Sequence, residues 1–114
     1  MSWLLRDGEV LASLEVADRV PARTRGLLGR SSLEGAMLLR PAASVHTLGM
    51  RFALDVAYCD RDLVVLETGR MPPWRLGRPR PAARAVLEAE AGAFERWGLR
   101  AGDRLEVAGE GART

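Results

Sequence analysis

The sequence contains no lysine, asparagine, glutamine or isoleucine, and only one cysteine and one histidine among its 114 residues. A single cysteine cannot form an internal disulfide, and one cysteine with one histidine cannot complete a four-ligand zinc site. No run of about 18 apolar residues is present, which excludes a membrane-spanning helix. The N-terminus lacks the charged start, apolar run and cleavage site of a signal peptide. We therefore expect a cytoplasmic protein with no cofactor and no metal.

What is present is the composition of an ordinary folded chain. Charged residues make up 28% and hydrophobic residues 47% of the sequence, which is typical of a soluble globule. The length suits one domain, expected over residues 1–108, followed by a flexible tail over residues 109–114. Every basic residue is arginine, and the net charge is +2. Codon usage in a GC-rich genome explains most of this bias. The alternative is a surface that needs the guanidinium fork to hold phosphate or carboxylate.

Hydrophobic periodicity predicts many short strands. The alternation is clearest over Glu9–Ala17, where Val10, Ala12, Leu14 and Val16 are expected to face inward. The other expected strands are Trp3–Leu5, Ala36–Leu39, Phe52–Cys59, Leu63–Thr68, Ala83–Ala89 and Arg104–Val107.

Helices and turns complete the expected architecture. We expect two short helices, Ala22–Leu28 and Ala91–Trp97, the second ended by Gly98. Asp60-Arg61-Asp62 is typical of a tight hairpin turn, and four prolines exclude regular structure from Met71–Ala82. This pattern predicts a mainly β (α+β) fold, a compact antiparallel β-sandwich or barrel-like domain with two short helices.

Several motifs resemble one known family. The run Val45–Asp60 (VHTLGMRFALDVAYCD) is similar to the central signature of the family called domain of unknown function 192 (DUF 192). The resemblance covers nearly the whole chain, in the right order and spacing, and it implies a mostly β, sandwich-like fold with no established activity. The other matching motifs are Arg25-Gly26-Leu27, Gly35–Leu39, Val86-Leu87-Glu88, Ala91-Gly92 and Gly98–Asp103.

Two positions depart from the family pattern. Many members carry a Trp-Met-Lys-Asn-Thr type run where this chain has His46–Met50, and the usual proline before the Leu/Ile-Asp pair is Ala53 here. The aspartates Asp55 and Asp60 are kept. Any role tied to the lysine and asparagine of that run is therefore not implied for this chain.

Asp55 is the first candidate for chemistry, because a carboxylate is costly in an apolar strand unless it is paired or hydrogen-bonded. It could lie on the solvent side or cap backbone amides of a neighbouring loop. It could instead take part in binding, with Arg51 or Arg40 as its partner. It could also act as a general base, although no nucleophile or second acid lies near it in sequence.

His46 is the one side chain that titrates near neutral pH without perturbation. It could line a pocket with Thr47 and Met50. It could also join Met37 and Met71 in a soft metal site, but methionines at these positions are equally expected in a core.

An arginine cluster surrounds Trp74 in the proline-rich segment. Trp74 could stack on an aromatic ligand or anchor a protein partner, while the guanidinium groups hold phosphate or carboxylate. It could instead fold back as a lid over the core. No acidic residue lies between Thr68 and Leu87, where the arginines are Arg70, Arg75, Arg78, Arg80 and Arg84. A second acid-free group of arginines lies within residues 19–30.

The leading hypothesis is a non-enzymatic binding module for a small anionic ligand or a protein segment. Nucleic acid is disfavoured, because the net charge is small and no nucleic-acid motif is present. The alternative is a small hydrolase or lyase-like enzyme that uses Asp55 with His46, or a His46–Cys59 pair, although Cys59 is more typical of a small buried hydrophobe. The candidate site residues are His46, Thr47, Met50, Arg51, Asp55, Trp74, Arg75 and Arg78.

Overall fold

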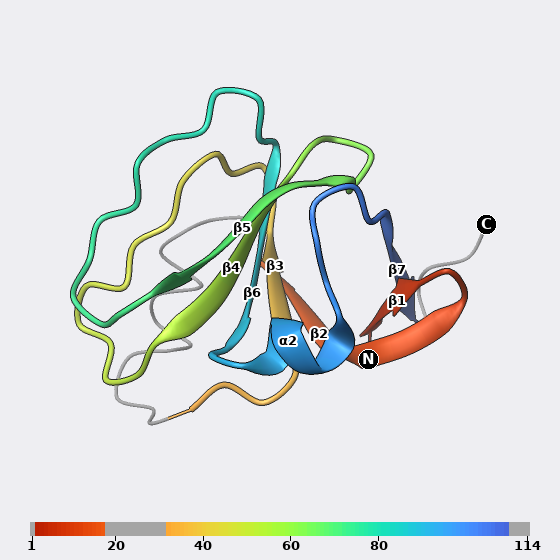
Figure 1. The fold of residues 1–114 in the computed structure, drawn as a ribbon, viewed down its shortest axis with the longest axis horizontal. Helices are drawn as coiled ribbons and strands as arrows, with labels where there is room; N and C mark the ends of the chain where they lie inside the picture. Colours follow the sequence, from red (N-terminus) through yellow and green to blue (C-terminus); the bar gives the residue numbers. More distant parts are fainter. Residues whose placement is uncertain (1, 18–31, 110–114) are drawn as a thin grey trace.

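The computed structural model describes residues 2–17 and 32–109, which form seven strands and one short helix (Figure 1). Each of the seven expected strands is present. The expected helix over residues 22–28 falls outside the described residues, as does most of the expected tail. The elements are β1 (Ser2–Arg6), β2 (Glu9–Ala17), β3 (Ala36–Leu39), β4 (Leu54–Cys59), β5 (Val65–Met71), β6 (Ala85–Glu90), α2 (Ala93–Trp97) and β7 (Leu105–Gly109).

The strands form one sheet in the order β5-β4-β6-β3-β2-β1-β7. All neighbouring strands are antiparallel except β2 and β3, which are parallel. The antiparallel arrangement expected from the sequence therefore holds for five of the six neighbouring pairs, and β2 with β3 is the exception. The physical reason is the long connection between the two strands, since a parallel neighbour needs a crossover rather than a tight turn.

The two edge strands of the sheet approach each other at one end. The backbone N–H of Val65 donates to the carbonyl of Asp103 at 2.8 Å, and the N–H of Leu105 donates to the carbonyl of Leu63 at 2.9 Å. An isolated bridge between Val64 and Arg104 lies between these bonds. The sheet is thus closed like a barrel at this end, in agreement with the barrel-like expectation.

The central strands are buried on both faces. All six residues of β4 are buried, as are five of the six residues of β6. One core lies on the concave side of the sheet and includes Leu87, Phe94 and Leu105. The second core lies on the opposite side, where Met37 and Met50 pack. Both strands are mostly apolar, as expected for strands buried on both faces, but they carry the buried acids Asp55 and Glu88.

The predicted inward face of β2 is only partly correct. Leu14 is 5% exposed, but Val10 is 58% and Val16 is 45% exposed. The register between β1 and β2 shifts between Leu4, which pairs with Ala12, and Leu5, which pairs with Val10. This bulge breaks the alternation of inward and outward side chains, so Val10 does not face the same side as Leu14. Val16 lies next to the last residue of the strand.

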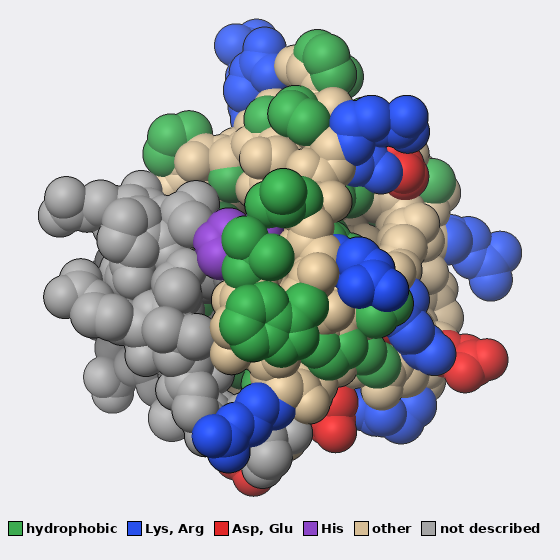
Figure 2. Space-filling model, turned by 90° about the vertical axis from the view of Figure 1, so that its left-hand side faces the viewer, with side chains coloured by type: hydrophobic (Ala, Val, Ile, Leu, Met, Phe, Trp, Pro, Cys, Tyr) green, Lys and Arg blue, Asp and Glu red, His purple; other side chains and the backbone are tan. Residues whose placement is uncertain are grey.

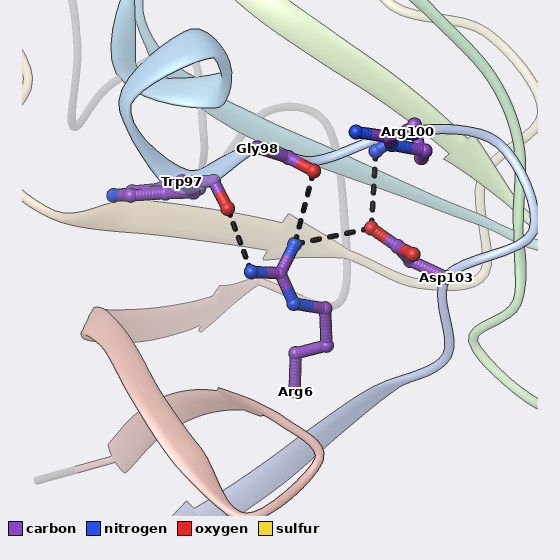
Figure 3. Close-up of polar contacts among 5 residues, drawn as sticks. All are labelled: Arg6, Trp97, Gly98, Arg100 and Asp103. Atoms are coloured by element: carbon purple, nitrogen blue, oxygen red, sulfur yellow. Dashed lines mark hydrogen bonds and ion pairs between the residues drawn. The ribbon is translucent and has the colours of Figure 1, made fainter.

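The end of α2 is held against β1 by Arg6 (Figure 3). Its guanidinium donates to the carbonyls of Trp97 at 2.6 Å and Gly98 at 3.2 Å, and it forms an ion pair with Asp103 at 3.1 Å. The same oxygen of Asp103 accepts from the N–H of Arg100 at 3.1 Å. A helix of five residues leaves its last carbonyls unsatisfied, and a cation at this end supplies the missing donors.

The hairpin turn after β4 is confirmed. Oδ1 of Asp60 accepts from the N–H groups of Asp62 at 2.9 Å and Val64 at 3.0 Å.

Within the described ranges, no helix has the length and apolarity needed to cross a membrane.

Candidate functional site

Two loops that are distant in sequence join into one surface. We call residues 43–50 together with residues 72–80 the Trp74 platform. The N–H of Thr47 donates to the carbonyl of Arg75 at 2.8 Å, and the N–H of Trp74 donates back to the carbonyl of Thr47 at 2.8 Å. The N–H of Gly77 donates to the carbonyl of Val45 at 2.9 Å, and His46 forms a bridge with Leu76. The structure therefore places the His46 segment and the proline-rich segment with Trp74 side by side.

The Thr47 side chain fixes the platform from within. It is fully buried. Its hydroxyl donates to the carbonyl of Pro72 at 2.6 Å and accepts from the N–H of Arg75 at 2.9 Å. Thr47 was predicted as a site residue that lines a pocket. Its observed contacts make it the residue that holds the loop around Trp74 in shape.

Trp74 points away from the core, so the lid alternative is wrong. Its φ is 63°, a left-handed conformation that bulky residues rarely adopt, and 65% of the residue is exposed. Leu76 and Leu48 are also exposed, at 76% and 39%. Figure 2 shows this side of the molecule, where hydrophobic and arginine side chains lie together and the histidine lies beside them.

A basic depression of about 460 Å³ lies next to the platform. We call it the basic groove. It contains no acidic lining residue, and its charged and aromatic lining residues are Tyr58, Arg70, Arg75, Arg78 and Arg80.

Two of these arginines, Arg70 and Arg80, form ion pairs within the fold. The Arg80 guanidinium lies 4.3 Å from the centre of the Tyr58 ring and pairs with Glu67 at 3.0 Å. Its hydrogen bond lowers the pKa of Glu67, while burial raises the pKa of Tyr58. In the described part of the chain, Arg75 and Arg78 form no ion pair. The charge of Arg78 contributes to the lowered pKa of Glu67, after the larger effect of Arg80.

Asp55 caps backbone amides, which was one of its predicted roles. Its Oδ2 accepts from the N–H groups of Gly92 at 2.9 Å and Phe94 at 3.1 Å, and its Oδ1 accepts from Nε of Arg70 at 3.0 Å. The predicted arginine partners, Arg51 and Arg40, are wrong, because β5 is the strand beside Asp55 and supplies Arg70 instead.

The sheet separates Asp55 from His46. Asp55 lies on the face of β4 that carries Ala57 and turns towards α2, whereas the loop with His46 covers the other face through Val45 and Met50. Nδ1 of His46 accepts from the N–H of Leu48 at 3.2 Å. The structure thus does not assemble the Asp55–His46 pair on which the enzyme alternative depends.

Cys59 and the methionines belong to the remaining catalytic and metal alternatives. Cys59 is fully buried, and burial, with a smaller effect of Asp60, raises its pKa to about 12. Such a thiol stays protonated and makes a poor nucleophile. Of the methionines proposed with His46 for a soft metal site, Met37 is buried in the second core and Met71 packs against that core, partly buried. Within residues 2–17 and 32–109, no three side chains of His, Cys, Asp or Glu gather as a metal site would need.

Sequence reasoning missed several residues that shape this region. Arg6 holds the segment after α2, and Arg70 joins β5 to Asp55. Leu76 supplies the most exposed large apolar side chain on the platform. At Gly77 a Cβ would collide with the carbonyl oxygen of Val45, so glycine permits the close approach of the two loops. In the sequence, the only indication of this close approach was a single glycine, Gly77, within a run rich in arginine and proline.

These observations define a mainly β domain whose curled, mixed sheet carries a rigid, exposed loop platform. The chain belongs to the DUF 192 family, described as an uncharacterized ACR, which it matches over residues 3–107. A UPF0127 protein of Pyrococcus furiosus is 31% identical over 103 residues, covering 86% of this chain and 89% of that protein.

Two solved structures share the fold. A protein of unknown function from Novosphingobium aromaticivorans superposes with a TM-score of 0.75 at 23% identity, over 92% of this chain and 82% of that one. A protein of Sinorhizobium meliloti, named as a candidate transcription regulator, gives a TM-score of 0.75 at 21% identity, over 93% and 91% of the two chains. At these identities the likeness concerns the fold alone.

Proposed function

We propose that this chain is a non-enzymatic binding module, and that the Trp74 platform and the basic groove hold an acidic segment of a protein partner. The conformation of Trp74 carries the proposal. A left-handed backbone costs a non-glycine residue on the order of 1–2 kcal/mol, and here that cost is combined with 65% exposure of a tryptophan. Strain of this kind persists where the surroundings enforce it, and it concentrates at functional sites. The buried Thr47 supplies that enforcement.

The chemistry of the surface favours an acidic partner with apolar side chains. Arg75 and Arg78 present guanidinium forks that suit carboxylates, and Trp74 with Leu76 offers apolar contact area. Tryptophan and arginine are also the residues that most often dominate binding energy at protein interfaces.

A protein segment fits this surface better than a small metabolite does. Small-molecule sites are concave and bury most of the ligand surface. Trp74 and Leu76 instead protrude from the platform, 65% and 76% exposed. We therefore commit to a protein segment as the partner, with a small anion as the competing outcome of the test.

The test uses the full chain as bait and identifies proteins that co-purify with it by mass spectrometry. A segment of the best candidate is then synthesised, and its Kd is measured for four proteins: wild type, Trp74→Ala, Arg75→Glu and the control Trp3→Ala. Trp3 is a comparable exposed tryptophan on β1, away from the platform. We expect Trp74→Ala and Arg75→Glu each to weaken binding by at least about tenfold, and Trp3→Ala to change it by less than about twofold.

Two results would overturn the proposal. One is a segment whose Kd is the same for Trp74→Ala and wild type. The other is a thermal shift produced by phosphate or citrate that depends on Trp74 and Arg75, with no protein segment bound, which would assign the surface to a small anion.

A further inference from the structure

The outer edge of β5 is open. β5 pairs with β4 on one side, from Val65 to Met71. On its other side Val65 bonds to the backbone of Gly102 and Asp103, but within the described ranges no backbone group from Leu66 to Met71 has a partner there. Five consecutive residues of this strand, 66–70, are exposed. An open edge of this kind is a template for a further strand.

Beyond Val65, β5 and the segment that follows α2 diverge and leave a depression that we call the wedge. This depression, of about 580 Å³, has Thr68–Arg70 on one wall and Gly98–Arg100 on the other, with Phe94 and Leu99 among its apolar lining. Figure 1 shows the backbone of the two walls, the green strand β5 and the blue segment that follows α2. The barrel is therefore closed at Val65 and open along the rest of β5.

The wall opposite β5 is fixed in place. Arg6 binds the carbonyls of Trp97 and Gly98, and Asp103 accepts from the N–H of Arg100 (Figure 3). The segment after α2 is thus tied to β1 through Arg6 as well as to Val65 at the closed end of β5. A preformed wall lowers the entropic cost of ordering an added segment.

The charge that favours an acidic occupant comes from the basic groove, which has no acidic lining residue and shares Arg70 with the wedge. The wedge itself is balanced in charge, because Asp55 and Glu95 line it together with Arg70 and Arg100. Asp55 is already bound by Arg70 and by two backbone amides, and Glu95 is exposed. A segment that follows β5 out of the wedge reaches Arg75 and Arg78.

We infer that the acidic partner segment binds in an extended conformation as an added strand on β5. Its backbone pairs with Leu66–Met71, its apolar side chains face Phe94 and Leu99, and its carboxylates meet Arg70 and Arg100. Strand addition of this kind draws affinity from main-chain hydrogen bonds and specificity from alternate side chains. The inference rests on the proposed function, because the same segment continues into the basic groove.

The experiment uses two synthetic probes with the full chain. The first is an acetylated, amidated heptapeptide that alternates glutamate and valine. The second has the same sequence with its five central amides N-methylated, which removes their donors and keeps their charge. We expect the first probe to slow hydrogen exchange in residues 66–71, and the second to bind at least about tenfold more weakly.

Matched charge reversals locate the binding. Arg100→Glu should weaken the first probe several-fold, whereas Arg96→Glu should not, because Arg96 is an exposed neighbour that lines a different depression. Equal binding of both probes, or unchanged exchange in β5 at millimolar probe, would overturn the inference. Protection of β5 that rises with protein concentration alone would do so too, because a second copy would then be the occupant.

The two proposals can fail separately. If Trp74→Ala weakens binding of the natural partner while the probe leaves hydrogen exchange in β5 unchanged, strand addition is wrong and the proposed function of the Trp74 platform is supported. If the probe protects β5 equally in wild type and Trp74→Ala while the natural partner ignores Trp74, the platform is wrong and strand addition stands.

Discussion

Nε of Arg70 lies 3.0 Å from Oδ1 of Asp55, across the neighbouring strands β5 and β4. The Asp55 side chain is 6% exposed and that of Arg70 is 55% exposed, so the pair joins a buried carboxylate to a guanidinium at the surface. The second carboxylate oxygen holds the N–H groups of Gly92 and Phe94 at the start of α2. Asp55 therefore ties two strands and a helix together.

Replacing Asp55 should cost far more stability than replacing its arginine partner. Asp55→Ala leaves two backbone donors without an acceptor, one of them buried, and we expect the free energy of unfolding to fall by about 3 kcal/mol. Arg70→Ala removes an exposed partner and should cost less than about 1 kcal/mol. Urea unfolding of both variants measures the difference. Equal losses would show that the ion pair, and not the amide capping, carries the effect.

The Asp55–Arg70 contact marks how far the sequence alone could lead. The strands, the turn at Asp60–Asp62 and the burial of β4 all follow from local composition. The pairing of Asp55 with Arg70 depends on a register shift between β4 and β5. Cys59 pairs with Val65 but Tyr58 pairs with Glu67, so Leu66 has no partner residue on β4. A bulge is set by tertiary packing as well as by local sequence, so counting residues from the turn would place Gly69 opposite Asp55.

The close approach of the two platform loops should depend on Gly77. A Cβ at this position would collide with the backbone oxygen of Val45, whereas nothing lies within 4 Å of a Cβ at Gly69. We expect Gly77→Ala to lower the free energy of unfolding by about 2 kcal/mol and Gly69→Ala to change it by less than about 0.5 kcal/mol. Chemical denaturation checks both values, and a neutral Gly77→Ala would mean that the loops separate at little cost.

The platform itself was only partly predictable. The arginine cluster around Trp74 and the candidates His46 and Thr47 were visible as local patterns. Their contact was not, because the N–H of Trp74 bonds to the carbonyl of Thr47, 27 positions away along the chain. Nothing in a proline-rich segment identifies the backbone partner of each residue. Asp55 and His46 were the opposite case. Their residue types suggested a catalytic pair, but the sheet places them on opposite faces.

Glycine should relieve strain at position 74. Because Trp74 has a φ of 63°, Trp74→Gly should be about 1 kcal/mol more stable than Trp74→Ala, whose Cβ keeps the steric penalty. Both variants should lose the binding attributed to the indole. Thermal and urea unfolding of the two proteins tests the first point, and the Kd of the partner segment tests the second. If the alanine variant is as stable as the glycine variant, the backbone at position 74 is not strained, and the strain argument for this site is wrong.

Alkaline pH should destabilise the fold through Cys59. Burial raises the pKa of this thiol from 9.0 to about 12, so the unfolded chain releases the proton first as pH rises. The stabilisation is complete below pH 9.0 and is lost progressively between pH 9.0 and about 12. At pH 10.5 wild type should have lost about 2 kcal/mol more than Cys59→Ala, relative to each protein at pH 8. The raised pKa of Tyr58 acts in both proteins and cancels in the comparison. Urea unfolding across this range measures the two curves, and parallel curves would show that the thiol ionises as readily in the folded protein as in the unfolded chain.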